Sequence, residues 1–119
     1  MQKILILGGG ISKERKISIQ TARQVNNVLK KSFKTSICEP DSNLIKKIKK
    51  FKPNIIFNAL HGRFGEDGYV QSILEKLRIK YTHSGVISSF IAMNKVLSKE
   101  IFIKNKILTP KFIKFNFNK

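Results

Sequence analysis

The sequence has 119 residues, which is enough for one domain and too few for two of ordinary size. Hydrophobic residues make up 41% of it, so it can form a core and lacks the low hydrophobicity of most disordered chains. The single cysteine, Cys38, excludes a disulfide framework and a cysteine-rich zinc site. The apolar runs are far too short to span a bilayer, and Met1 to Lys3 lead into a strand-like run without a signal segment. We therefore expect a cytoplasmic protein.

The chain is strongly basic, with 24 Lys and Arg against 7 Asp and Glu, a formal net charge of +17. Such a charge is typical of proteins that bind nucleic acid or another polyanion. However, only four of the basic residues are Arg, the residue that base edges and phosphates favour. The densest Lys cluster follows the polar side of one expected helix: Lys46, Lys47, Lys49, Lys50 and Lys52. A solvated helix face is the favoured interpretation, and a nucleic-acid groove is the alternative.

Apolar patterning predicts alternating strands and helices in chain order. Lys3 to Leu7 is a short apolar run that suits a strand buried on both faces. The expected elements that follow are a helix over about 14–31, a strand over 33–38, a Lys-rich helix ending at Pro53, a strand over 55–60, a helix carrying Val70, Ile73, Leu74 and Leu77, a strand over 80–82, helical structure over 88–106 in one or two pieces, and an alternating strand over 111–117. In the first helix, Ile17, Ala22, Val25, Val28 and Leu29 form the expected buried stripe.

This order predicts an α/β fold with an open, mostly parallel sheet and flanking helices. In such folds the functional loops lie at the carboxyl ends of the strands. Two loops of this sequence are expected there, one over residues 8–14 and one over residues 61–68.

The first of these loops is rich in glycine and leads into a helix. Glycines allow a ligand to approach the backbone, and a helix N-terminus attracts anions. A dinucleotide motif is poorly matched, because Lys13 stands where its last glycine belongs. Glu14 begins the helix; spacing alone favours a residue that complements the helix dipole over one that binds a ligand's ammonium group.

The second loop packs one His, one Arg, two acids and three glycines into residues 61–68. Turns need glycine, but they do not need so many titratable groups. A loop of this composition after a buried strand is a candidate site. The alternative is a salt-bridged turn in which Glu66 or Asp67 caps the next helix. His83 lies outside these motifs and is expected to be a surface turn residue.

Four segments resemble, in the same order, the signatures of the D-alanine–D-alanine ligase family of ATP-grasp ligases. They are Gly9 to Ser18, Ala59 to Gly68, Tyr81 to Val86, and Met93-Asn94-Lys95. The resemblance implies a Rossmann-like pre-ATP-grasp domain over residues 1–108, with residues 109–119 beginning the central ATP-grasp domain. It also implies an enzyme that uses ATP and Mg²⁺ to join two D-alanines through an acyl phosphate for peptidoglycan synthesis.

The resemblance implies roles for five residues. Glu14 would anchor the ammonium group of the first D-alanine, which reverses the preference drawn from spacing. His61 would lie at the substrate carboxylate or developing phosphate, Glu66 would orient these groups, and Ser18 would lie in the same pocket. Lys95 would contact ATP, and a mobile point charge suits phosphate.

The sequence departs from the family pattern at four positions. His83 and Phe64 replace usual glycines, Asn94 replaces a usual Asp, and Lys16 replaces a frequent acid. Complete family members are roughly twice this length or more, as expected for several domains. We therefore expect a truncated product, one half of a split enzyme or a fragment, which lacks the metal ligands and is inactive alone.

Expected partners are D-alanine, ATP, the missing ATP-grasp domains and, by resemblance, a second copy in a homodimer. Three alternatives for function stand together: the N-terminal domain of such a ligase, a basic nucleic-acid-associated domain, and a non-catalytic relic of the ligase fold.

Overall fold

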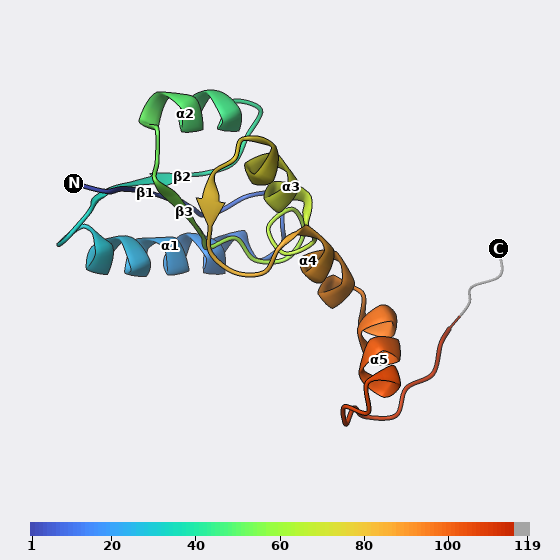
Figure 1. Cartoon of the computed structure of the whole chain (residues 1–119). Coiled ribbons are helices and arrows are strands. Elements are labelled where there is room, and N and C mark those ends of the chain that lie inside the picture. Colours follow the sequence, from blue (N-terminus) through green and yellow to red (C-terminus); the bar gives the residue numbers. More distant parts are fainter. Residues whose placement is uncertain (116–119) are drawn as a thin grey trace.

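A computed structural model describes residues 1–115 of the chain. Four parallel strands form one sheet in the order β2-β1-β3-β4, flanked by helices (Figure 1). The elements are β1 (Lys3–Leu7), α1 (Arg15–Leu29), β2 (Lys34–Cys38), α2 (Leu44–Phe51), β3 (Ile55–Asn58), α3 (Tyr69–Lys76), β4 (Lys80–Tyr81), α4 (Val86–Met93) and α5 (Lys95–Lys104). The predicted α/β class with a parallel sheet is confirmed.

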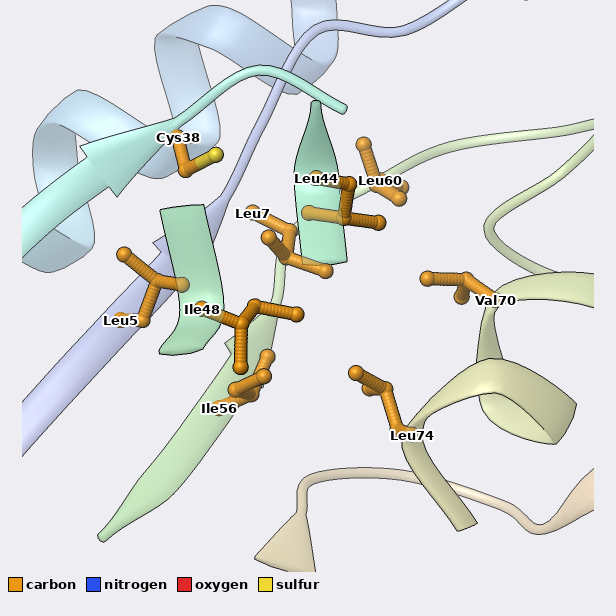
Figure 2. Close-up of a cluster of buried hydrophobic side chains, with 9 residues drawn as sticks. All are labelled: Leu5, Leu7, Cys38, Leu44, Ile48, Ile56, Leu60, Val70 and Leu74. Atoms are coloured by element: carbon orange, nitrogen blue, oxygen red, sulfur yellow. The ribbon is translucent and has the colours of Figure 1, made fainter. Parts of the chain in front are cut away.

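The central strand β1 has a continuous apolar sequence because both of its faces are covered. Leu5 and Leu7 face a core cluster that also contains Ile48 of α2 and Leu74 of α3 (Figure 2). Ile4 and Ile6 face a second cluster that includes Ala22 of α1. Figure 1 shows the corresponding layers, with α1 and α2 on opposite sides of the sheet.

Cys38 ends β2 inside the first cluster, which also contains Leu44 (Figure 2). Burial raises the pKa of its thiol. Cys38 is a free, buried cysteine that fills space in this core.

The predicted apolar stripe of α1 is only partly correct. Ala22 is completely buried and Val25 and Leu29 pack against the second cluster, whereas Ile17 and Val28 are exposed. Ile17 and Val28 therefore lie outside the stripe of α1 that packs on the sheet.

The Lys-rich helix α2 buries Leu44 and Ile48 and exposes its lysines. Asp41 accepts two hydrogen bonds, one from the N–H of Asn43, which precedes the helix, and one from the ammonium group of Lys47, which lies within it. The lysines thus form a solvated helix face, as the favoured interpretation of the sequence holds.

Helices α4 and α5 extend away from the sheet, and α5 has no buried residue (Figure 1). Asn94 separates them: its Oδ1 accepts the N–H groups of Val96 and Leu97 and caps α5. The expected helical stretch over 88–106 is therefore two helices. Within residues 1–115, no helix is long and apolar enough to cross a membrane.

The strand expected over residues 111–117 is wrong for residues 111–115, which form no strand. Residues 116 and 117 lie outside the described part of the chain. Alternating polarity can predict a strand, but a strand also needs a neighbouring strand for its backbone hydrogen bonds. Instead, the Lys99 ammonium donates to Thr109 Oγ1 and Pro110 O, so this segment lies along α5.

Leu74 offers a test of the core because it is completely buried. We expect Leu74→Ala to lower the free energy of unfolding by about 2–5 kcal/mol, since it leaves a cavity in a packed cluster. The matched control, Ile87→Ala, removes a side chain that is 74% exposed and should change stability by less than about 0.5 kcal/mol. Urea unfolding of both variants measures the difference, and equal losses would contradict the described core.

Candidate functional site

The loops that follow β1 and β3 meet at the carboxyl edge of the sheet. They do so because β1 and β3 are neighbours, with Leu7 paired to Asn58 at the ends of the two strands. The connections from β1 and β3 lead away to opposite edges of the sheet, so this is the point at which the strand order reverses. Ligands of open α/β sheets bind at such a point.

Ser18 holds the two loops together from the first turn of α1. Its buried hydroxyl donates to Ala59 O at 2.7 Å and accepts the Gly9 N–H at 2.8 Å. Ser18 is therefore part of the site, with its hydrogen-bonding capacity directed to the backbone of both loops.

Glu14 lies immediately before α1 and is exposed. Its carboxylate lies against the second loop: a Cβ on Gly62 would stand only 2.8 Å from Glu14 Oε2 and 2.5 Å from Ser12 Oγ. Gly62 also has a φ of 73°, in the left-handed region that favours glycine. The left-handed backbone therefore favours glycine at this position, and any Cβ here would also displace the tips of the Ser12 and Glu14 side chains.

Glu66 approaches the same glycine from within its own loop. Glu66 Oε2 accepts the Gly62 N–H at 2.7 Å, and the Glu66 N–H donates to Gly62 O at 2.9 Å. The carboxylates of Glu14 and Glu66 consequently both lie next to Gly62. Asp67 instead accepts the Phe64 N–H within the loop and the Tyr69 N–H at the first position of α3.

His61, Glu66 and Lys95 line one cleft of about 490 Å³. The ring of His61 is half-buried, and its Nε2 lies 3.3 Å from Thr21 Oγ1 of α1. Lys95 is exposed at the first position of α5. The structure therefore brings four of the five predicted residues to the edge of this cleft or to Gly62, and Ser18 lies beneath them.

His83 is exposed in a turn, as expected, but it also lines this cleft. Its Nδ1 lies 2.8 Å from Thr82 Oγ1, and its ring meets Phe57 edge-on at 5.6 Å between centroids. Sequence reasoning missed the buried polar residues that line the cleft, among them Asn58 and Gln71. The sequence feature that could have identified Asn58 and Gln71 is a polar residue within an apolar stretch. Asn58 ends an apolar strand, and Gln71 follows the core residue Val70.

An exposed ion pair joins the first loop to the end of β2. The Arg15 guanidinium donates to both oxygens of Glu39, which also accepts the Gly10 N–H. The hydrogen bond from Arg15 and then that from Gly10 lower the pKa of Glu39.

Within residues 1–115, no three His, Cys, Asp or Glu side chains gather as they would to hold a metal ion. The carboxylates of Glu14 and Glu66 both lie beside Gly62, but among residues 1–115 no third such side chain joins them as a metal ligand. This part of the chain therefore does not fit a Mg²⁺ site, and we assign no step to a metal here.

By its fold and its paired loops, the chain belongs to the class of open, parallel α/β domains that carry their binding residues at the carboxyl edge of the sheet. Residues 34–84 match a family model described as the D-ala D-ala ligase N-terminus. Over 99% of its length the chain is 66% identical to the D-alanine–D-alanine ligase of Pelagibacter ubique, and over 91% it is 50% identical to that of a Wolbachia of Brugia malayi.

Among solved structures, the D-alanine–D-alanine ligase of Bacillus anthracis complexed with ATP covers the whole chain with a TM-score of 0.83 and 34% identity. The chain spans only 39% and 32% of the two relatives and 43% of that solved structure. It belongs to the D-alanine–D-alanine ligase family and corresponds to the N-terminal part of its members.

Gly62 provides a test of the contact between the two loops. We expect Gly62→Ala to destabilise the chain by about 1–2 kcal/mol, the cost of a left-handed conformation for a residue with a Cβ. It should also displace Ser12 and Glu14, which NMR chemical shifts of both residues would report.

The control for this test is Gly85→Ala. Gly85 has a φ of −72°, and a Cβ there would meet only ordinary contacts at 3.7 and 3.8 Å. If the two substitutions perturbed Glu14 equally, the described meeting of the loops at Gly62 would be incorrect.

The Arg15–Glu39 pair predicts a dependence of stability on pH. Because the folded-state pKa of Glu39 is lowered, the pair stabilises the fold above the ordinary carboxyl pKa, and this contribution is lost as the pH falls through the folded-state pKa. Thermal unfolding should therefore show Glu39→Gln to be less stable than the parent near neutral pH and equal to it in acid.

The difference should be small and should shrink with added salt, because the side chains of Arg15 and Glu39 are 52% and 41% exposed. A difference that persisted unchanged into acid would exclude the ion pair as its cause.

Proposed function

We propose that this chain supplies the substrate-side groups of a D-alanine–D-alanine ligase. In the proposed reaction, the carboxylate of one D-alanine attacks the γ-phosphorus of ATP, which gives an acyl phosphate and ADP. The amine of a second D-alanine then attacks the acyl carbon, phosphate leaves, and a peptide bond forms. The dipeptide would serve peptidoglycan synthesis in the cytoplasm.

The observation that carries the proposal is the meeting of Glu14, His61 and Glu66 at Gly62 and the adjoining cleft. The chain that has this arrangement is 66% identical in sequence to the Pelagibacter ligase. A phosphate-binding glycine loop does not need an acid at the start of α1 to lie against the loop that follows β3. A basic domain that binds nucleic acid does not need one there either.

The proposed roles follow from charge and position. The carboxylate of Glu14 pairs with the ammonium group of the first D-alanine, and no hydrogen bond of its side chain within residues 1–115 competes for it. His61 donates to the substrate carboxylate or to the phosphate that forms on it. Lys95 lines the same cleft and offers a mobile positive charge to ATP phosphate.

Glu66 and Ser18 orient rather than react. Glu66 holds the Gly62 backbone through two hydrogen bonds, and Ser18 fixes the glycine loop to Ala59. This keeps Glu14 and His61 at a fixed separation, as a substrate held by both ends requires.

Phosphoryl transfer depends on groups that position metal and phosphate, and residues 1–115 offer no metal cluster. We therefore propose that the chain works with ATP-grasp domains, in the same or another polypeptide, and that it releases no phosphate from ATP and D-alanine alone. A homodimer through this domain is part of the same proposal.

The test replaces the corresponding region of the Pelagibacter ligase with this chain and follows ATP- and D-alanine-dependent phosphate release. Glu14→Gln should lower kcat/KM by about 10- to 100-fold, because a hydrogen bond to a charged group contributes about 1.5–3 kcal/mol. Glu100→Gln, the same chemical change at an exposed position of α5, serves as the matched control and should leave the rate unchanged.

Four outcomes distinguish the alternatives. Turnover by the hybrid and its loss in Glu14→Gln support the proposal. A folded hybrid without turnover would favour a non-catalytic relic. Unchanged activity in Glu14→Gln would refute the role of Glu14, and salt-sensitive binding to nucleic acid by a hybrid without turnover would favour the basic binding domain.

A further inference from the structure

Gln71 is a polar residue at a core position of α3. It is only 2% exposed and lies beside Val70 and Leu74, both completely buried. Its Nε2 donates to Gly65 O at 2.8 Å, whereas its Oε1 has no hydrogen-bond partner within the described residues. A buried acceptor without a partner costs stability, and an apolar side chain would avoid that cost. Gln71 is therefore not explained by packing.

Asn58 supplies a second amide to the same carbonyl oxygen. Its Nδ2 donates to Gly65 O at 2.8 Å, and its Oδ1 accepts the Leu60 N–H at 3.2 Å. Gly65 O can only accept hydrogen bonds, so both amides must present nitrogen to it and their orientations are fixed. The two bonds occupy both lone pairs of this oxygen.

Gly65 has no freedom to move toward the sheet. A Cβ at this position would overlap with Leu60, so the backbone here is packed directly against the segment that follows β3. The next residue is Glu66, which holds Gly62 through its carboxylate and its N–H. The position of Gly65 O thus sets where the Glu66 carboxylate lies.

We infer that Asn58 and Gln71 form a paired-amide clamp on Gly65 O, and that Gln71 is a positioning residue for Glu66 and Gly62. The clamp acts on loop geometry and makes no contact with substrate. Its importance for catalysis rests on the proposed ligase function, but its effect on the loop can be measured without turnover.

The test uses two variants of the 119-residue chain. Gln71→Glu keeps the shape of the side chain but sets a carboxylate oxygen against Gly65 O. Gln71→Met keeps the length and removes both polar atoms. We expect both variants to speed hydrogen exchange of the Glu66 amide by about tenfold near neutral pH, the loss of about one hydrogen bond.

The two variants should then differ in acid. Desolvation raises the pKa of a buried carboxyl, and once protonated it can donate to Gly65 O as the native amide does. The loop of Gln71→Glu should therefore recover native chemical shifts as the pH falls, whereas that of Gln71→Met should not. His61, Glu66, His83 and Lys95 line the same cleft and Glu75 lies one turn further along α3, so the parent chain is titrated in parallel.

Gln24→Glu, the same substitution at an exposed position of α1, is the control and should leave the loop unchanged at every pH.

Gln71→Met also separates positioning from folding: its midpoint of thermal unfolding should be equal to or above that of the parent, because the unpaired Oε1 is gone. The inference would be overturned if the Glu66 amide exchanged at the parent's rate in both variants. It would also be overturned if exchange became faster only as much as a lower midpoint of thermal unfolding explains. Because these readouts need no ligase activity, their failure is distinct from failure of the proposed function.

Discussion

The site depends on one constraint, the parallel pairing of β1 with β3 in the centre of the sheet. Leu7 pairs with Asn58, and the Ala59 N–H continues the ladder to Leu7 O at 2.9 Å. Two chain segments that are some fifty residues apart therefore leave the sheet side by side. Without this pairing, Glu14 and His61 would have no reason to lie near each other.

Close packing of α1 on the sheet converts this pairing into a defined site. A Cβ on Gly8 would stand 2.5 Å from the Cβ of Ala22, so glycine and alanine let the helix approach the strand. Ser18, one turn before Ala22, then reaches both Gly9 and Ala59. The start of α1, and Glu14 with it, is held over the second loop by backbone contacts that tolerate little displacement.

The sequence predicted the order of strands and helices because apolar runs and helical spacing are local signals. It also predicted that the two loops would lie at the carboxyl edge of the sheet, since the strand order and the glycine-rich and titratable compositions of the loops are local signals as well. The clamp on Gly65 was not predicted: Asn58 and Gln71 are single polar residues in apolar surroundings, and only the fold shows that they share one acceptor. The strand expected from residue 111 is wrong over residues 111–115 for a related reason, because local alternation cannot show whether a partner strand is near.

Three of the four departures from the family pattern make physical sense in the fold, and the fourth, Lys16, has no structural explanation. Phe64 and His83, which stand where the family usually has glycine, have φ values of 74° and 77°, a conformation that costs other residues about 1–2 kcal/mol. Each has compensating contacts: the Phe64 N–H donates to Asp67 and its ring packs near Tyr69, while His83 contacts Phe57.

Asn94 needs no such compensation. Its side-chain oxygen accepts both N–H groups that an aspartate would accept at the start of α5. The replacement removes a negative charge next to Lys95 while the cap is retained. The backbone that presents Lys95 to the cleft is therefore set by hydrogen bonding rather than by charge, and the lysine is left without a neighbouring carboxylate at position 94 to neutralise it.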